Sequence, residues 1–180
     1  NRDKTVFAKI EINADEISNG DLKIKANKID PEGIVYNSLT REAVAGAKLY
    51  LLNEAGNKVN PELLETGQQG QVTDDSGSYH FIVKEEGKYQ ILVEKDGYAI
   101  SPSEELAPKS DNYIRPNDIT DADSSDNDIQ VVDYSRAPKM TENVLYYLNF
   151  DLQSGDPDVL NNHIPIDPGK ENLLKITKQA

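Results

Sequence analysis

Hydrophobic and polar residues alternate with a period of two through residues 33–98. The apolar members of three runs are expected to share one face of a strand: Ala47, Leu49 and Leu51; Tyr79, Phe81 and Val83; Tyr89, Ile91 and Val93. Polar residues such as Lys48, His80 and Gln90 lie between them. Strict alternation is typical of half-buried strands in an antiparallel sandwich. Turn-forming residues separate the runs, at 54–57, 74–77, 85–87 and 96–97.

The same periodicity continues on both sides of this stretch. Residues 5–12 alternate, and the pair Asn19-Gly20 that follows is a strong hairpin signal. Residues 1–28 are therefore expected to form a strand and a hairpin, either as an extension of the sandwich or as the tail of a preceding repeat. Residues 144–152 predict a further strand, whose apolar face is made by Tyr146, Leu148, Phe150 and Leu152.

Three polar segments are predicted to connect the strands. Residues 60–71 form a loop with a short helical turn that begins at Pro61. Residues 101–128 contain three prolines and no periodicity, which predicts a long loop, and strand pattern resumes at Ile129. Residues 161–169 are expected to be extended or to turn. The sandwich domain is thus predicted to span residues 29–168, and residues 169–180 to form a strand that leads into a next repeat.

Four blocks of sequence occur in an order that resembles a known family. They are Gly-Ile-Val-Tyr at 33–36, Ala-Val-Ala-Gly-Ala-Lys-Leu at 43–49, Thr-Asp-Asp-Ser-Gly-Ser-Tyr-His-Phe at 73–81 and Gly-Lys-Tyr-Gln-Ile-Leu-Val at 87–93. This set resembles the carboxypeptidase-regulatory-like and Cna-B (SdrD B-like) modules of bacterial surface proteins. The resemblance implies a seven-stranded antiparallel Greek-key β-sandwich of prealbumin-like or Ig-like type. The end of the chain, Leu-Lys-Ile-Thr-Lys-Gln-Ala at 174–180, resembles the opening of DUF11-type repeats.

Composition narrows the classes of function. The chain of 180 residues carries 32 acidic and 19 basic side chains, a net charge of -13, which argues against nucleic-acid binding. It has no cysteine, so disulfides, thiolate metal sites and cysteine nucleophiles are excluded. No apolar run approaches the ~18–20 residues of a membrane helix. The chain opens on Asn1 and is interpreted as part of a longer protein; the resemblance implies an extracellular, cell-surface location.

The sequence offers little for catalysis. Its two histidines, His80 and His163, lie in unlike contexts, and no hydrolase, P-loop or zinc-protease motif occurs. We therefore predict that the chain is not an enzyme. The resemblance raises the question of an internal Lys–Asn isopeptide bond, for which Asn149 is a candidate asparagine. Its parity places Asn149 on the face opposite Leu148 and Phe150, which disfavours the bond.

The acidic segment at 117–133 is the candidate metal site. Its aspartates, together with backbone carbonyls, could supply the ~6–8 oxygens that Ca²⁺ prefers, and the absence of cysteine selects against soft metals. The spacing is not that of an EF-hand, because Asp126 and Val132 occupy the glycine and glutamate positions. A solvated acidic loop is the alternative interpretation. The proposed calcium ligands are Asp121, Asp123, Asp126 and Asp128.

These features favour a non-catalytic structural or adhesive repeat of a large secreted or cell-surface bacterial protein. Its expected partners are neighbouring repeats of the same chain. The alternative is a ligand-binding module for a carbohydrate or for a host or matrix protein. The chain has nine tyrosines and no tryptophan, whereas an aromatic platform for sugars more often uses tryptophan, which disfavours a carbohydrate ligand.

Overall fold

The structure is a computed structural model that describes residues 31–120, 123–125 and 128–169. The predicted N-terminal hairpin (1–28) and the final strand of segment 169–180 lie outside these residues, apart from Gly169. The described strands are β1 (Glu32–Asn37), β2 (Lys48–Asn53), β3 (Gln71–Val72), β4 (Ser78–His80), β5 (Gly87–Glu94), β6 (Asp123–Ser125), β7 (Asp128–Gln130), β8 (Asn149–Leu152), β9 (Asp158–Leu160) and β10 (Ile164–Ile166).

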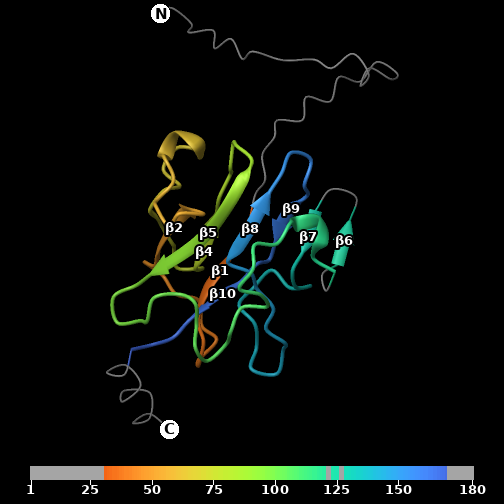
Figure 1. Cartoon of the computed structure of the whole chain (residues 1–180). Coiled ribbons are helices and arrows are strands. Elements are labelled where there is room, and N and C mark those ends of the chain that lie inside the picture. The colour runs from red at the N-terminus through yellow and green to blue at the C-terminus, as the bar shows by residue number, and fades with distance from the viewer. Residues whose placement is uncertain (1–30, 121–122, 126–127, 170–180) are drawn as a thin grey trace, which may run out of the picture.

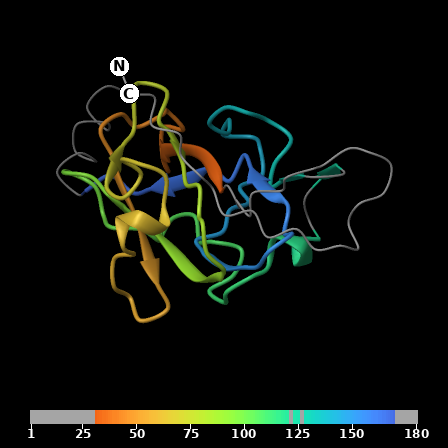
Figure 2. The ribbon, with the colours of Figure 1, turned by 90° about the horizontal axis from the view of Figure 1, so that it is seen from above.

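These strands form three sheets, with the orders β10-β1-β4, β3-β2-β5-β8 and β6-β7-β9. Both views place β6, β7 and β9 on the side of the molecule away from β2 and β3 (Figures 1 and 2). Within the described residues there is no α-helix, only two short 3-10 turns, η2 (Pro61–Leu63) and η3 (Pro116–Asp118). The all-β prediction is confirmed.

The predicted wiring of seven antiparallel strands is wrong in direction as well as in number. β1 and β10 are parallel, and so are β7 and β9. Neither β9 nor β10 was expected as a strand, because each is three residues long and Pro165 interrupts the pattern. Proline is tolerated in β10 because this strand lies at the edge of its sheet.

The alternation of residues does predict which side chains form the core. Ala47, Leu49 and Leu51 are at most 1% exposed, and the two other apolar runs, around Phe81 and Ile91, are also buried. The residues between them, such as Lys48 and His80, are exposed. Burial of one such aliphatic or aromatic side chain contributes about 1.5–3 kcal/mol to folding. The core therefore lies between the inner faces of the β1 and β2 sheets, as a sandwich requires.

The predicted strand 144–152 is regular only from Asn149 onward. Its expected apolar face is buried throughout, from Tyr146 to Leu152, but Tyr147 is buried as well. Burial on both sides replaces alternation in this part: the loop 101–120 covers Tyr146, whose OH donates to the Leu106 carbonyl, and Tyr147 packs against Phe150. The backbone amide of Lys109 donates to Tyr146 O, so that loop, and not a neighbouring strand, satisfies this carbonyl.

The predicted long loop 101–128 is also more ordered than expected. Asp123–Ser125 is a strand, and it pairs antiparallel with Asp128–Gln130. Backbone pairing holds these three-residue strands together, and a segment this short shows no readable alternation of side chains. The turn predicted at Pro61 is confirmed: it is η2, and the side chain of Asn60 accepts from the Glu62 amide.

Candidate functional site

The acidic segment is described only in part. Asp121 and Asp126 lie outside the described residues, and for Asp123 the structure gives only the backbone, in β6. Asp128 lies in β7, where the parallel register places Asp158 of β9 beside it. Sequence reasoning had no means to find Asp158, because β9 was not predicted. Among the described side chains no group of three or more His, Asp or Glu residues gathers as a metal site.

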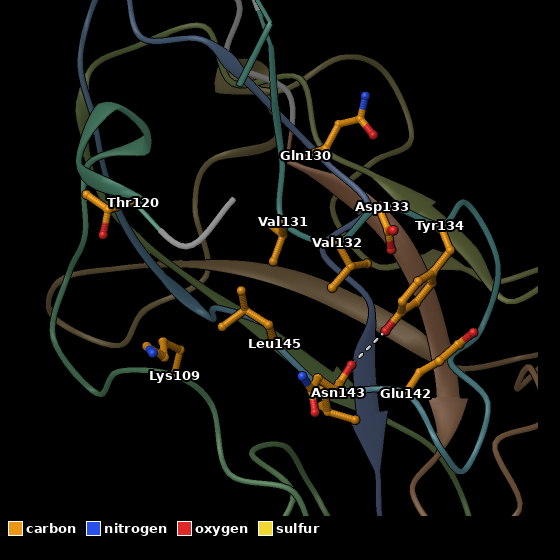
Figure 3. A pocket seen from close by; sticks show the side chains of 11 residues that line it. Lys109, Thr120, Gln130, Val131, Val132, Asp133, Tyr134, Glu142, Asn143 and Leu145 are labelled. Carbon is orange, nitrogen blue, oxygen red and sulfur yellow. Dashed lines mark hydrogen bonds between the residues drawn. The ribbon is translucent and has the colours of Figure 1, made fainter. Parts of the chain in front are cut away.

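An open cleft of about 790 Å³ lies between two segments that follow β7 and precede β8. In Figure 3 the side chains of Val131, Val132 and Leu145 lie between Lys109 and Thr120 on one side and Tyr134, Asn143 and Glu142 on the other. The floor is thus apolar and the rim polar. Such a combination suits a ligand that has both an apolar surface and hydroxyl or amide groups.

The rim of the cleft is held by Tyr134 and by a salt bridge. Tyr134 OH donates to the Asn143 carbonyl at 2.8 Å (Figure 3). Arg136 forms two hydrogen bonds to Glu142, at 2.8 and 2.6 Å. The guanidinium of Arg136, together with the Lys139 backbone amide, lowers the pKa of Glu142 to about 2. Glu142 therefore stays ionised and paired at neutral pH, which makes it a poor proton donor or acceptor for catalysis.

His163 lies beneath this rim and contacts β1. The imidazole is 4% exposed and stacks on the ring of Tyr134, with the ring centroids 5.7 Å apart. Nδ1 accepts from the Ile34 amide at 3.1 Å, and Nε2–H donates to the Tyr134 carbonyl at 2.7 Å. These partners define the neutral Nε2–H tautomer. Burial lowers the pKa of His163, so the ring is neutral at pH 7 and serves as a structural acceptor.

The hydrogen bond between the Ile34 amide and His163 extends the ladder that joins the first and the last described strands, β1 and β10. The ladder pairs Val35 with Ile164 and Asn37 with Ile166. At the start of β1 the Asn162 amide donates to Glu32 O, and just after the end of β1 the Ser38 amide donates to Ile166 O. The Ile34 amide donates to the imidazole Nδ1 of His163, so this side chain takes the place of a backbone acceptor in the ladder.

Two buried carboxylates attach loops to this framework. Asp156 accepts from Arg115, from Asn117 and from the Gln153 amide. Asp167, just after β10, accepts from the Ser103 hydroxyl and the Glu104 amide. Burial alone would raise the pKa of Asp167, but these hydrogen bonds outweigh it and lower the pKa. Both aspartates act as fixed acceptors for neighbouring loops.

The remaining residues singled out in the sequence have structural surroundings. His80 is exposed, on the solvent-facing side of β4 as predicted. The side-chain amide of Asn149 donates to the Asp111 carbonyl at 2.9 Å. Sequence reasoning missed Asn162, Asp156 and Asp167, and each of them has side-chain hydrogen bonds to residues 15 or more positions away. No local pattern could have identified these pairings.

No family model and no curated protein matches the chain. Among solved structures the chain is similar to the crystal structure of the group B streptococcus pilus 2b backbone protein. The two are 13% identical with a TM-score of 0.37, and the similarity covers 80% of this chain and 42% of that chain. The chain therefore spans less than half the length of that protein. No helix in the described part of the chain has the length and apolar character needed to span a bilayer.

Proposed function

We propose that the chain is a non-catalytic structural module of a bacterial cell-surface protein, placed between neighbouring repeats and carrying tension along the polypeptide. The observation that supports this function is the parallel pairing of β1 with β10. These are the first and the last described strands, and they lie side by side (Figure 1).

Direction decides how such a pair responds to force. In a parallel pair, the N-terminal end of one strand and the C-terminal end of the other lie at opposite ends of the ladder. Tension applied through residues 31 and 169 therefore slides β1 along β10, and the hydrogen bonds across the pair are loaded together. An antiparallel terminal hairpin would instead be opened one bond at a time. Forced unfolding is governed by the unfolding rate. That rate is low when several hydrogen bonds must break together, because the barrier to unfolding is then high.

Side chains strengthen the same pair. The Nδ1 acceptor of His163 adds one bond to β1, and Tyr79 OH donates to the Asn162 carbonyl from the far side of β1 at 2.6 Å. Gly33 is required here, since a Cβ at this position would lie 2.3 Å from Asn162 O. Each net hydrogen bond contributes about 0.5–1.5 kcal/mol.

Single-molecule force spectroscopy tests this function. The chain, flanked by marker domains and pulled through its termini, should resist unfolding, and His163→Leu should unfold at lower force because the Ile34 amide loses its acceptor. Leu64→Ala is the matched control, since Leu64 is 1% exposed and lies outside the β1–β10 ladder. Leu64→Ala should lower the free energy of unfolding at least as much as His163→Leu does, but it should lower the unfolding force less. If both variants lower the force in proportion to stability, the β1–β10 pair is not the element that resists tension.

The cleft supports a second candidate, a ligand-binding role for a carbohydrate or host protein. Its polar rim and apolar floor favour this alternative. Glycan arrays and pull-down with the isolated chain test it, with Leu145→Arg as the variant that fills the cleft. Saturable binding that is lost in this variant would support the role; binding that persists would place the ligand elsewhere.

A further inference from the structure

Among the described residues no strand pairs with the outer edge of β4, yet most backbone groups of this edge are hydrogen bonded. β4 pairs with β1 through Tyr79 and its alternate neighbours, so Ser78, His80 and Ile82 direct their backbone groups away from β1. A row of such groups is a template on which another chain can add a strand. Here side chains of residues 68–74 pair with the amides of Ser78, His80 and Ile82 and with the His80 carbonyl, and the Glu65 backbone amide donates to the Ile82 carbonyl at 3.3 Å.

Gln71 pairs with His80 in the manner of a strand residue. Its Oε1 accepts from the His80 amide at 3.1 Å, and its Nε2 donates to the His80 carbonyl at 2.6 Å. One side-chain amide thus satisfies both backbone groups of one edge residue. A peptide group of an added strand would offer the same donor and acceptor.

Gln68 and Asp74 continue this protection on both sides of Gln71. Gln68 Oε1 accepts from the Ile82 amide at 2.7 Å, and Asp74 Oδ1 accepts from the Ser78 amide at 3.4 Å. Gln68 is 4% exposed, and its Nε2 has no hydrogen-bond partner among the described residues. An unpaired buried amide costs about 1–3 kcal/mol. The fold tolerates this cost at Gln68, which indicates that the bond from the Ile82 amide to Gln68 Oε1 is needed at the edge.

We infer that Gln68, Gln71 and Asp74 are edge guards: they keep the β4 edge from adding a strand of a second copy of this chain. A groove of about 480 Å³ lies along the edge, lined by Gln68, Gln71, His80 and Ile82, so removal of the glutamine side chains leaves room for a strand. The inference rests in part on the proposed function, because repeats held in tandem meet one another at high local concentration. Two copies present identical edges, which permits a symmetric pair.

Sedimentation velocity over a concentration series on the double variant Gln68→Ala/Gln71→Ala tests the inference. Self-association should strengthen by about tenfold or more relative to the unchanged chain. It should strengthen further with salt, because Asp74 and Glu65 repel their counterparts at the same edge. In amide exchange, His80 and Ile82 should lose protection at concentrations where this variant is monomeric and regain it as the variant associates.

Two controls separate edge pairing from simple destabilisation. Gln69→Ala removes a glutamine that pairs with Leu51 of β2 at 2.8 and 2.9 Å, away from the β4 edge, and should destabilise without self-association. Adding His80→Pro to the double variant removes an outward amide, and the chain should return to a monomer. A folded double variant that stays monomeric, or one whose association is unaffected by His80→Pro, would overturn the inference. Neither result depends on how the chain responds to force, so the two proposals can fail separately.

Discussion

Replacing Asn162 with alanine should destabilise the chain by about 3–5 kcal/mol, because it removes the side-chain hydrogen bonds to two buried backbone groups. Asn162 is fully buried. Its Oδ1 accepts from the Tyr147 amide at 2.8 Å, and its Nδ2 donates to the Tyr147 carbonyl at 2.9 Å and to Tyr79 OH at 3.1 Å. The side chain thus joins the segment before β8 to the segment before β10.

The magnitude follows from these contacts. Loss of the amide removes the acceptor that Asn162 offers to the Tyr147 N–H and the donor that it offers to the Tyr147 C=O, at about 1–3 kcal/mol for each buried group. Tyr79 OH keeps a partner, since it also donates to the Asn162 carbonyl at 2.6 Å, and it adds little to the sum. Domains of this size have a total stability of about 5–15 kcal/mol, so the loss is a large fraction of the whole.

Urea unfolding followed by tyrosine fluorescence measures the loss, because the chain has nine tyrosines and no tryptophan. Asn112→Ala is the control: Asn112 is exposed, and its replacement should change stability by less than about 0.5 kcal/mol. Amide exchange at Tyr147 should accelerate only in Asn162→Ala. A loss below about 1 kcal/mol with an unchanged m-value would refute the reasoning that this amide pairs the interior backbone.

Three other predictions concern ionisable groups. Stability should fall as the pH drops below about 6.5, the pKa of an unfolded histidine, because burial lowers the pKa of His163 in the folded chain. Protonation of the ring also removes the acceptor for the Ile34 amide. Urea titrations at several pH values should show a flatter dependence of stability on pH for His163→Gln. Asp167→Asn should cost about 2 kcal/mol near pH 7, where the carboxylate accepts from Ser103, and this deficit should shrink only below about pH 4, since hydrogen bonding holds the pKa of Asp167 low. If the 117–133 segment binds Ca²⁺ as proposed, an ion concentration of about 100 times Kd should stabilise the chain by about 2.7 kcal/mol in thermal melts. The double variant Asp123→Ala/Asp126→Ala should remove the effect. Equal melting midpoints with Ca²⁺ and with EDTA would contradict the site.

The sequence predicted the faces of the strands well because burial depends on parity. Leu49 and Ile91 are buried whichever strand lies beside them, so a period of two is enough to identify them. Parity contains no information on the direction of a neighbouring strand. The parallel pairs β1–β10 and β7–β9 were missed for that reason, and the resemblance to an antiparallel family reinforced the error.

The polar residues that hold the fold together were harder to predict for a related reason. A buried aspartate or asparagine is stable only where its partners meet it, and those partners are set by topology. Asp167, for example, accepts from residues more than 60 positions away. Predicting the burial of Asp167 would have required the pairing of β10, which the sequence pattern did not indicate.

The glutamines at 68, 69 and 71 show how a sequence can hide such information in polar residues. In one dimension they belong to a polar loop, and their composition suggests only solvent exposure. In the fold, two of them use both amide groups to pair with one backbone residue each, His80 for Gln71 and Leu51 for Gln69. A glutamine amide has the donor and acceptor of a peptide group at the end of a flexible stem, so it can end a sheet where a strand would extend it. Polar loops beside short strands are therefore places where edge protection can be sought in other β-sandwich sequences.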